Sequence, residues 1–151
     1  MSVRLDHTLS QYLSIADHAV LTLARPWSLA MWFARDVAYT TTEPWLFGWG
    51  RGSRNAAMAM LRASDYATAP DTLKVCVFDA QNDAIYIHAG TIPIQDTAWH
   101  HLAVTMSAEG SLVVYVDGGQ DATAANPSVG TVDHAREWVL GANSGGSANY
   151  F

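Results

Sequence analysis

The most informative pattern in this chain is an alternation of apolar with small or polar positions in two neighbouring runs, residues 99–106 and 111–117. A period of two is what a half-buried strand requires. The break at 107–110 and the dipeptide Asp117-Gly118 are both typical turn sequences. We therefore predict two antiparallel strands joined by a short turn, followed by a second turn at Asp117.

Short runs of this kind recur along the whole chain and are separated by Gly, Pro, Asn and Asp. They predict an all-β sandwich of short strands without long helices. The chain of 151 residues is long enough for one domain with a substantial core, and a single domain is expected over residues 1–151. Strands are expected near residues 3–5, 12–15, 28–35, 45–50, 56–62, 73–78, 84–89, 99–106, 112–117 and 137–140.

The two runs also carry a specific signature. Residues 99–105 (Trp-His-His-Leu-Ala-Val-Thr) and 115–118 (Tyr-Val-Asp-Gly) resemble the hairpin of the laminin-G-like group of concanavalin A-like β-sandwiches. The resemblance extends over nearly the whole chain, including residues 6–15, 27–33 and 137–143. It implies a jelly-roll sandwich of two antiparallel sheets. It implies no single function, because this scaffold hosts lectins, adhesion modules, glycosidases and virion proteins.

The end of the sequence departs from the resembled family. The family continues past its Gly/Asn loop into a last strand that pairs near the first one, whereas this sequence stops at Tyr150-Phe151. Either the given sequence is incomplete or the sandwich lacks its last strand, in which case a sheet edge is expected to be open near residues 3–5. An unpaired edge is a template for another chain. We expect other protein subunits or a second copy to bind there, with Tyr150 and Phe151 among the contacts.

Charge and hydropathy exclude several kinds of partner. The net charge is −6 and the eight Lys and Arg residues are scattered, so a nucleic acid is not an expected partner. No apolar run approaches the roughly 18 residues of a membrane span, and the first residues show no signal peptide, so membrane insertion is not expected. Cys76 lies alone in an apolar strand-like run and is expected to be a buried small side chain.

The distribution of acidic residues does not favour a hydrolase. Retaining glycosidases need two carboxyls about 5 Å apart, which along one strand requires a spacing of two or four residues. Among the glutamates only Glu137 has an acidic residue, Asp133, at such a spacing, and that sequence is loop-like. His100 and His101 are adjacent on a strand and face opposite ways, so they cannot share a metal ion. We expect structural, hydrogen-bonded histidines and no catalytic residue.

A calcium site is a more serious possibility. Asp79, Asn82 and Asp83 place three side-chain oxygens in one loop, and Asp117 or Asp121 is positioned to add another if the loops converge. The alternative is that these side chains cap their own backbone, as Asp and Asn commonly do in turns. Ca²⁺ is the one cofactor that the sequence suggests.

Aromatic residues are the remaining candidates for a binding site, because flat rings stack on the C–H face of a sugar and form hot spots of protein interfaces. Trp45, Phe47 and Trp49 alternate along a predicted strand and are either core or a stacking platform. Asn143, in the Gly/Asn loop, is a candidate for contacting sugar hydroxyls. Three other tryptophans match core positions of the resembled family and are expected to fill the sandwich: Trp32, Trp99 and Trp138.

These observations favour a non-enzymatic structural or attachment module of a larger assembly that acts through protein–protein contacts. A phage virion decoration or tail component is one example, and a virion or extracellular surface is the expected location. The alternative is a lectin-like module that binds a glycan, with or without Ca²⁺. A glycoside hydrolase is the most distant alternative.

Overall fold

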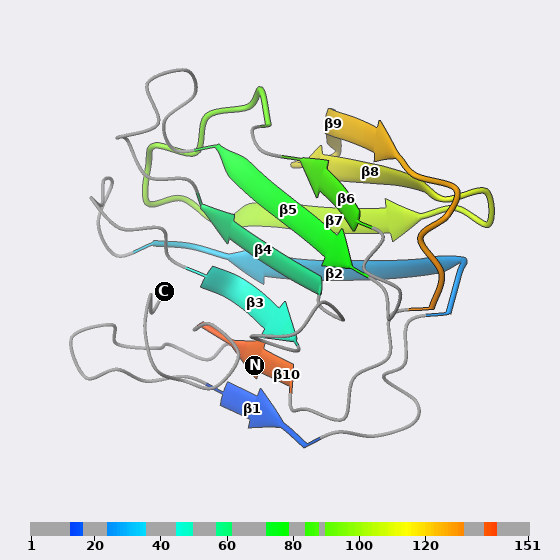
Figure 1. Cartoon of the computed structure of the whole chain (residues 1–151). Helices are drawn as coiled ribbons and strands as arrows, with labels where there is room; N and C mark the ends of the chain where they lie inside the picture. Colours follow the sequence, from blue (N-terminus) through cyan, green and yellow to red (C-terminus); the bar gives the residue numbers. More distant parts are fainter. Residues whose placement is uncertain are drawn as a thin grey trace.

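The computed structural model describes residues 13–16, 24–35, 45–49, 57–61, 72–78, 84–87, 90–131 and 138–141. These residues form two antiparallel sheets, and in Figure 1 the six-stranded sheet lies in front of the four-stranded one. The predicted all-β sandwich is confirmed. The six-stranded sheet has the order β1 (Leu13–Ile15), β10 (Trp138–Leu140), β3 (Trp45–Trp49), β4 (Ala57–Leu61), β5 (Leu73–Phe78) and β6 (Ala84–Ile87). The four-stranded sheet has the order β2 (Trp27–Phe33), β7 (His100–Met106), β8 (Ser111–Val116) and β9 (Gly119–Ala125).

The hairpin predicted from the alternating runs is present. β7 and β8 pair antiparallel with Leu102 opposite Val116. Asp117 and Gly118 form the next turn with φ of 51° and 83°, the left-handed conformation that tight hairpin turns require. That turn leads directly into β9, which the sequence pattern did not predict. β9 contains no large apolar residue, so neither strand propensity nor hydrophobic alternation marks it.

The core lies between the sheets and takes every second residue of the long strands. On β7 and β8 the inward positions, from Leu102 to Met106 and from Leu112 to Val116, are all buried. The six-stranded sheet contributes Phe47 and Trp138, whose ring centroids lie 6.2 Å apart. The expectation that Trp138 fills the sandwich is therefore confirmed. Cys76 is buried as expected.

A register shift in β3 decides part of the question about its aromatic residues. The pairing with β4 slips between Trp45 and Phe47, so Leu46 is an extra residue on the β3 side. Leu46 and Phe47 are consequently both buried, although neighbouring residues of a regular strand face opposite ways. Phe47 is core rather than platform. The side chains of Trp45 and Trp49 lie outside the described part of the structure.

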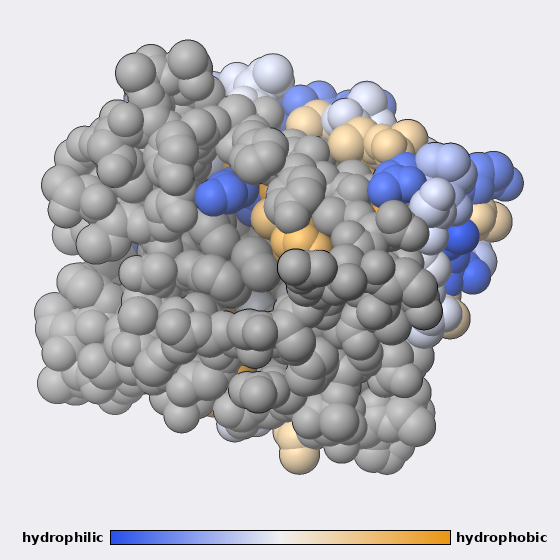
Figure 2. Space-filling view, in the orientation of Figure 1, coloured by the Kyte–Doolittle hydropathy of each residue, from blue (hydrophilic) through white to orange (hydrophobic). Residues whose placement is uncertain are grey.

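Among the described residues, β1 is an edge of the six-stranded sheet and pairs on one side with β10. Its side chains Leu13 and Ile15 are 39% and 51% exposed. The edge predicted near residues 3–5 lies outside the described residues, as do Tyr150 and Phe151. Hydrophilic residues gather along the right-hand rim in Figure 2, where Figure 1 places the β7–β8 turn and the segment after β9. No helix in the described segments is long and apolar enough to cross a membrane.

Candidate functional site

Two tryptophans expected in the core lie on the surface instead. Trp32 on β2 is 63% exposed, and Trp99, just before β7, is 57% exposed. The physical reason is the period of two: with Phe33 buried against the core, Trp32 must face outward. On β7 the buried Leu102 assigns His101 to the outward side in the same way, and Trp99 directly precedes the strand.

The exposed rings gather on the outer side of the four-stranded sheet, and we refer to Trp32, Trp99, His101 and Tyr115 as the aromatic face. Trp32 and His101 are cross-strand partners on β2 and β7, with ring centroids 5.0 Å apart and planes tilted by 56°. Tyr115 alternates with the buried residues of β8 and so shares this side. Three of these rings, from β2, β7 and β8, thus lie on one side of the sheet, and Trp99 is exposed directly before β7.

The residues that lie between Trp32 and Tyr115 on the sheet are small and uncharged. Ala103 lies opposite Ala30 on one neighbouring strand and opposite Tyr115 on the other, so methyl groups form the floor between Trp32 and Tyr115. The other outward positions of the sheet are Ser28, Thr105, Ser111, Val113, Gln120, Thr123 and Ala125. The surface is therefore flat and partly apolar, with hydroxyl and amide groups at its margins.

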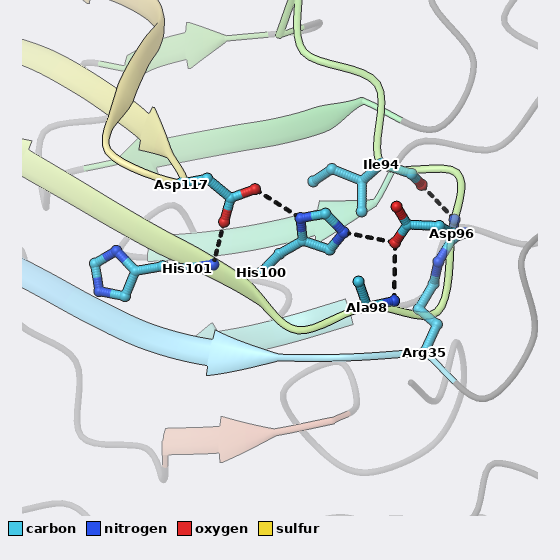
Figure 3. A network of polar contacts seen from close by, with 7 residues as sticks. All are labelled: Arg35, Ile94, Asp96, Ala98, His100, His101 and Asp117. Carbon is cyan, nitrogen blue, oxygen red and sulfur yellow. Dashed lines mark hydrogen bonds and ion pairs between the residues drawn. The ribbon is translucent and has the colours of Figure 1, made fainter.

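A polar cluster ties down the end of this sheet, and we call Asp96, His100 and Asp117 the His100 clamp (Figure 3). The two ring nitrogens of His100 contact different carboxylates: Nδ1 lies 2.8 Å from Asp117 Oδ2 and Nε2 lies 2.9 Å from Asp96 Oδ1. Asp117 also accepts a hydrogen bond from the backbone N–H of His101 at 2.8 Å. Asp96 accepts one from the backbone N–H of Ala98 at 2.8 Å. The clamp thus joins the segment before β7 to the β8–β9 turn.

The contacts of the clamp shift the ionisation of all three groups. Partial burial alone would lower the pKa of His100, but its hydrogen bonds to Asp117 and Asp96 outweigh that effect and raise the pKa above 6.5. The N–H of His101 and then the ring of His100 lower the pKa of Asp117. The ring of His100 and then the N–H of Ala98 lower the pKa of Asp96. The geometry therefore favours an imidazolium between two carboxylates.

A second anchor holds the same segment from the side of β2. The guanidinium of Arg35 is buried at the end of β2 and donates a hydrogen bond to the backbone carbonyl of Ile94 (Figure 3). Ile94 is itself buried in the core. The segment that leads into Trp99 is therefore fixed at Ile94, and beyond that residue its link to the sheet runs through Asp96 and His100.

His100 fulfils the expectation of a structural, hydrogen-bonded histidine. The clamp is not arranged as a nucleophile–base pair, because both ring nitrogens already contact carboxylates. The described segments contain no group of three or more His, Cys, Asp or Glu that could hold a metal ion. Asp121, considered as a further calcium ligand, instead accepts hydrogen bonds from the backbone N–H groups of Thr91 and Ile92.

Most of the site residues predicted from sequence cannot be located. The candidate calcium ligands and the candidate glycan or partner contacts that lie outside the described residues are Asp79, Asn82, Asp83, Asn143, Tyr150 and Phe151. The surface positions of Trp32 and Trp99 were not predicted. Strand alternation was the signal that would have identified both of them.

A laminin G family model, described as the concanavalin A-like lectin/glucanases superfamily, matches residues 6–151. No curated protein gives a significant sequence match.

Solved structures with the same fold include a toxin binding domain, laminin domains and one domain of an arabinanase. The binding domain of Paraclostridial Mosquitocidal Protein 1 superposes with a TM-score of 0.66 at 12% identity, over 87% of this chain and 34% of that one. Domains LG4-5 of the mouse laminin alpha1 chain give 0.60 at 15% identity, over 91% and 33%. Domain 4 of AbnA, a GH43 extracellular arabinanase from Geobacillus stearothermophilus solved in complex with arabinotriose, gives 0.54 at 18% identity, over 87% and 57%. At such identities the likeness establishes the fold, and this chain spans about a third of the first two structures.

Proposed function

This chain belongs to the concanavalin A-like lectin/glucanase superfamily, and on that premise we propose that it is a non-enzymatic recognition module that binds a neutral glycan on its aromatic face. The observation that carries the proposal is the exposure of Trp32 and Trp99 on one side of the same sheet. Tryptophan buries 150–250 Å² when it is packed, so two largely exposed tryptophans on one surface are a strong indication of a binding site.

The chemistry of the aromatic face fits a saccharide. Indole rings offer flat apolar surfaces to the C–H side of a sugar ring, and the alanine floor leaves room beside them. His101, Gln120 and the outward threonines supply hydrogen-bonding groups for hydroxyls. The described outward positions of the four strands carry no Lys, Arg, Asp or Glu, which favours an uncharged ligand over an ionic one. The arabinotriose complex of AbnA domain 4 is consistent with glycan binding on this fold.

The non-enzymatic part of the proposal rests on the state of the clamp carboxylates. A retaining glycosidase needs two carboxyls about 5 Å apart that both reach the scissile bond. Asp96 and Asp117 instead approach the same imidazole from opposite sides, and each also accepts a backbone hydrogen bond. Both oxygens of Asp117 and Oδ1 of Asp96 thus hold the chain in place.

The test is a saccharide-binding screen followed by calorimetry. An array of neutral plant and bacterial oligosaccharides, arabinotriose included, is probed with and without Ca²⁺, so that a calcium requirement would appear directly. We expect Trp32→Ala and Trp99→Ala each to weaken binding about tenfold, which corresponds to about 1.4 kcal/mol of lost stacking. Ile15→Ala is the matched control, because it removes an exposed apolar side chain from the other sheet. If no saccharide binds the wild-type protein, the glycan proposal is wrong.

A second candidate function has its own observation. The exposed Leu13 and Ile15 on edge strand β1 favour a structural or attachment module that contacts other subunits, a phage virion component being one example. Light scattering of the purified chain tests this. If β1 is an interface, the wild type is a defined oligomer and Ile15→Lys is a monomer. A wild-type monomer at all concentrations would rule out self-association through β1.

A further inference from the structure

We propose that His100 is a positioning residue for Trp99: its cationic ring holds the segment before β7 against the β8–β9 turn, and loss of its proton frees Trp99 from the aromatic face. The clamp itself is defined by contacts within the described residues and does not depend on any ligand. Its consequence for ligand binding rests on the proposed function.

The two contacts of the His100 ring require two ring protons. Each ring nitrogen of His100 lies within 2.9 Å of a carboxylate oxygen, and ionised carboxylates only accept hydrogen bonds. A neutral imidazole has one N–H and can satisfy one of the two. The observed arrangement therefore uses the imidazolium, and deprotonation must release either Asp96 or Asp117.

The two carboxylates that contact His100 are not held equally firmly by the rest of the chain. Asp117 is fixed independently: Oδ1 accepts the N–H of His101, and its own N–H donates to the carbonyl of His101 at 2.9 Å. Asp96 is held otherwise by Ala98, within its own segment. The side chain of Asp96 is 66% exposed and that of Asp117 is 47% exposed. Water therefore replaces the contact between His100 and Asp96 more readily than the contact between His100 and Asp117. Neutral His100 therefore keeps Asp117 and releases Asp96.

The contact of Asp96 with His100 restrains the short segment that contains Trp99. Arg35 anchors the segment at Ile94, and the next tie to the sheet is the contact of Asp96 with His100. Trp99 lies inside this span and is itself exposed. Once Asp96 is released, the orientation of Trp99 depends on its covalent bond to His100 and on weak surface contacts. Trp32, which lies within β2, does not depend on the clamp.

The charged groups around the clamp keep both acceptors ionised. Arg35 lies on the side of Asp96 and His101 on the side of Asp117, and both favour the carboxylate forms. From β2 the neighbour of the His100 ring is the uncharged ring of Phe33, with centroids 5.8 Å apart. Of the three clamp residues, His100 is therefore the one that loses its proton as the pH rises, and its hydrogen bonds to Asp117 and Asp96 raise its pKa against the opposing effect of partial burial.

The experiment follows the imidazole of His100 and the indole N–H of Trp99 by two-dimensional NMR from about pH 5 to about pH 9. His100→Gln and Trp99→Phe assign the signals. We expect the Trp99 signal to shift with the same midpoint as His100, whereas the indole signals of Trp27 and Trp138 stay unchanged. In His100→Gln the pH-dependent shift of Trp99 should disappear.

Asp96→Asn makes the test sharper without removing the histidine. Loss of the carboxylate charge should move the midpoints of His100 and Trp99 down together by about half to one pH unit. Glu109→Gln is the control, because it removes an exposed carboxylate at the distant β7–β8 turn and should move neither midpoint. A Trp99 signal that ignores pH, or that does not follow His100 in Asp96→Asn, would overturn the proposal.

Saccharide affinity is measured separately over the same range with the best ligand of the array. The loss at high pH should not exceed the loss caused by Trp99→Ala, because the clamp acts through that side chain. If no saccharide binds, the NMR titration still decides whether the clamp exists, so the two proposals fail independently.

Discussion

Replacing Asp121 with alanine should destabilise the sandwich through two backbone N–H groups. Asp121 lies in β9 at a register shift, where Tyr115 pairs with Gln120 but Val114 pairs with Ala122. This bulge leaves Asp121 without a partner on β8 and its side chain is 6% exposed. Its Oδ1 accepts the N–H of Thr91 at 2.6 Å and the N–H of the following residue at 2.7 Å. The side chain thus ties the connection after β6 to β9.

The magnitude follows from what the alanine leaves behind. Two partly buried donors lose a charged acceptor, and each unsatisfied group costs about 1–3 kcal/mol. Water can reach this part of the surface, so we expect a loss of about 2–4 kcal/mol in the free energy of unfolding for Asp121→Ala. Asp121→Asn keeps an acceptor oxygen and should cost about 1 kcal/mol, because the other oxygen, Oδ2, has no hydrogen-bond partner among the described residues.

The assay is urea unfolding with linear extrapolation, combined with hydrogen exchange of the amides of Thr91 and Ile92. Both amides should exchange faster in Asp121→Ala and remain protected in Asp121→Asn. If the alanine variant loses less than about 0.5 kcal/mol, or if asparagine costs as much as alanine, the two hydrogen bonds do not carry the stability assigned to them.

Three further predictions test the same structure. Gly90→Ala should destabilise by about 1–3 kcal/mol in thermal unfolding, because the new Cβ would lie 1.9 Å from Asp121 Oδ2 and must displace it. Trp32→Ser should change the free energy of urea unfolding by less than about 0.5 kcal/mol, since a large loss would mean that this ring is packed rather than presented. The stabilisation from the raised pKa of His100 is complete below 6.5 and is lost as the pH rises through the raised value. The urea midpoints of wild type and His100→Gln should therefore differ most near pH 6 and converge in alkaline solution; a constant difference would contradict the linkage.

The sequence predicted those parts of the fold in which large apolar residues alternate. The hairpin of β7 and β8 followed from period two alone, and the strand positions of β3, β5 and β10 followed from short apolar runs. β9 was not predicted, because its inward residues, Ala122 and Ala124, are too small to produce a visible hydrophobic alternation. The Leu46 bulge could not be predicted, since a one-residue register shift depends on the partner strand.

The candidate site was less predictable for a different reason. Trp32 and Trp99 were assigned to the core from residue type and resemblance, although the parity set by Phe33 and Leu102 places them outside. Where the two signals disagree in a strand without a bulge, alternation is the stronger one, because neighbouring side chains then face opposite sides of the sheet. The contact of His100 with Asp117 could in principle be predicted from the sequence, since the hairpin register places Asp117 beside His101. The role of Asp96 depends on the path of an irregular segment, which sequence patterns do not encode.

The regular alternation of β7 and β8 separates inward residues that fold this protein from outward residues that are available for recognition. On β7 the even-numbered positions from Leu102 onward belong to the interior and the odd-numbered ones meet solvent, and β8 follows the same parity. Substitutions at the solvent-facing positions can change ligand specificity, while the buried positions keep the two sheets packed together. A library randomised at Ala30, Ala103, Tyr115 and Gln120 should therefore yield folded variants with new specificities, which makes this sheet a scaffold for selection as well as the proposed binding surface.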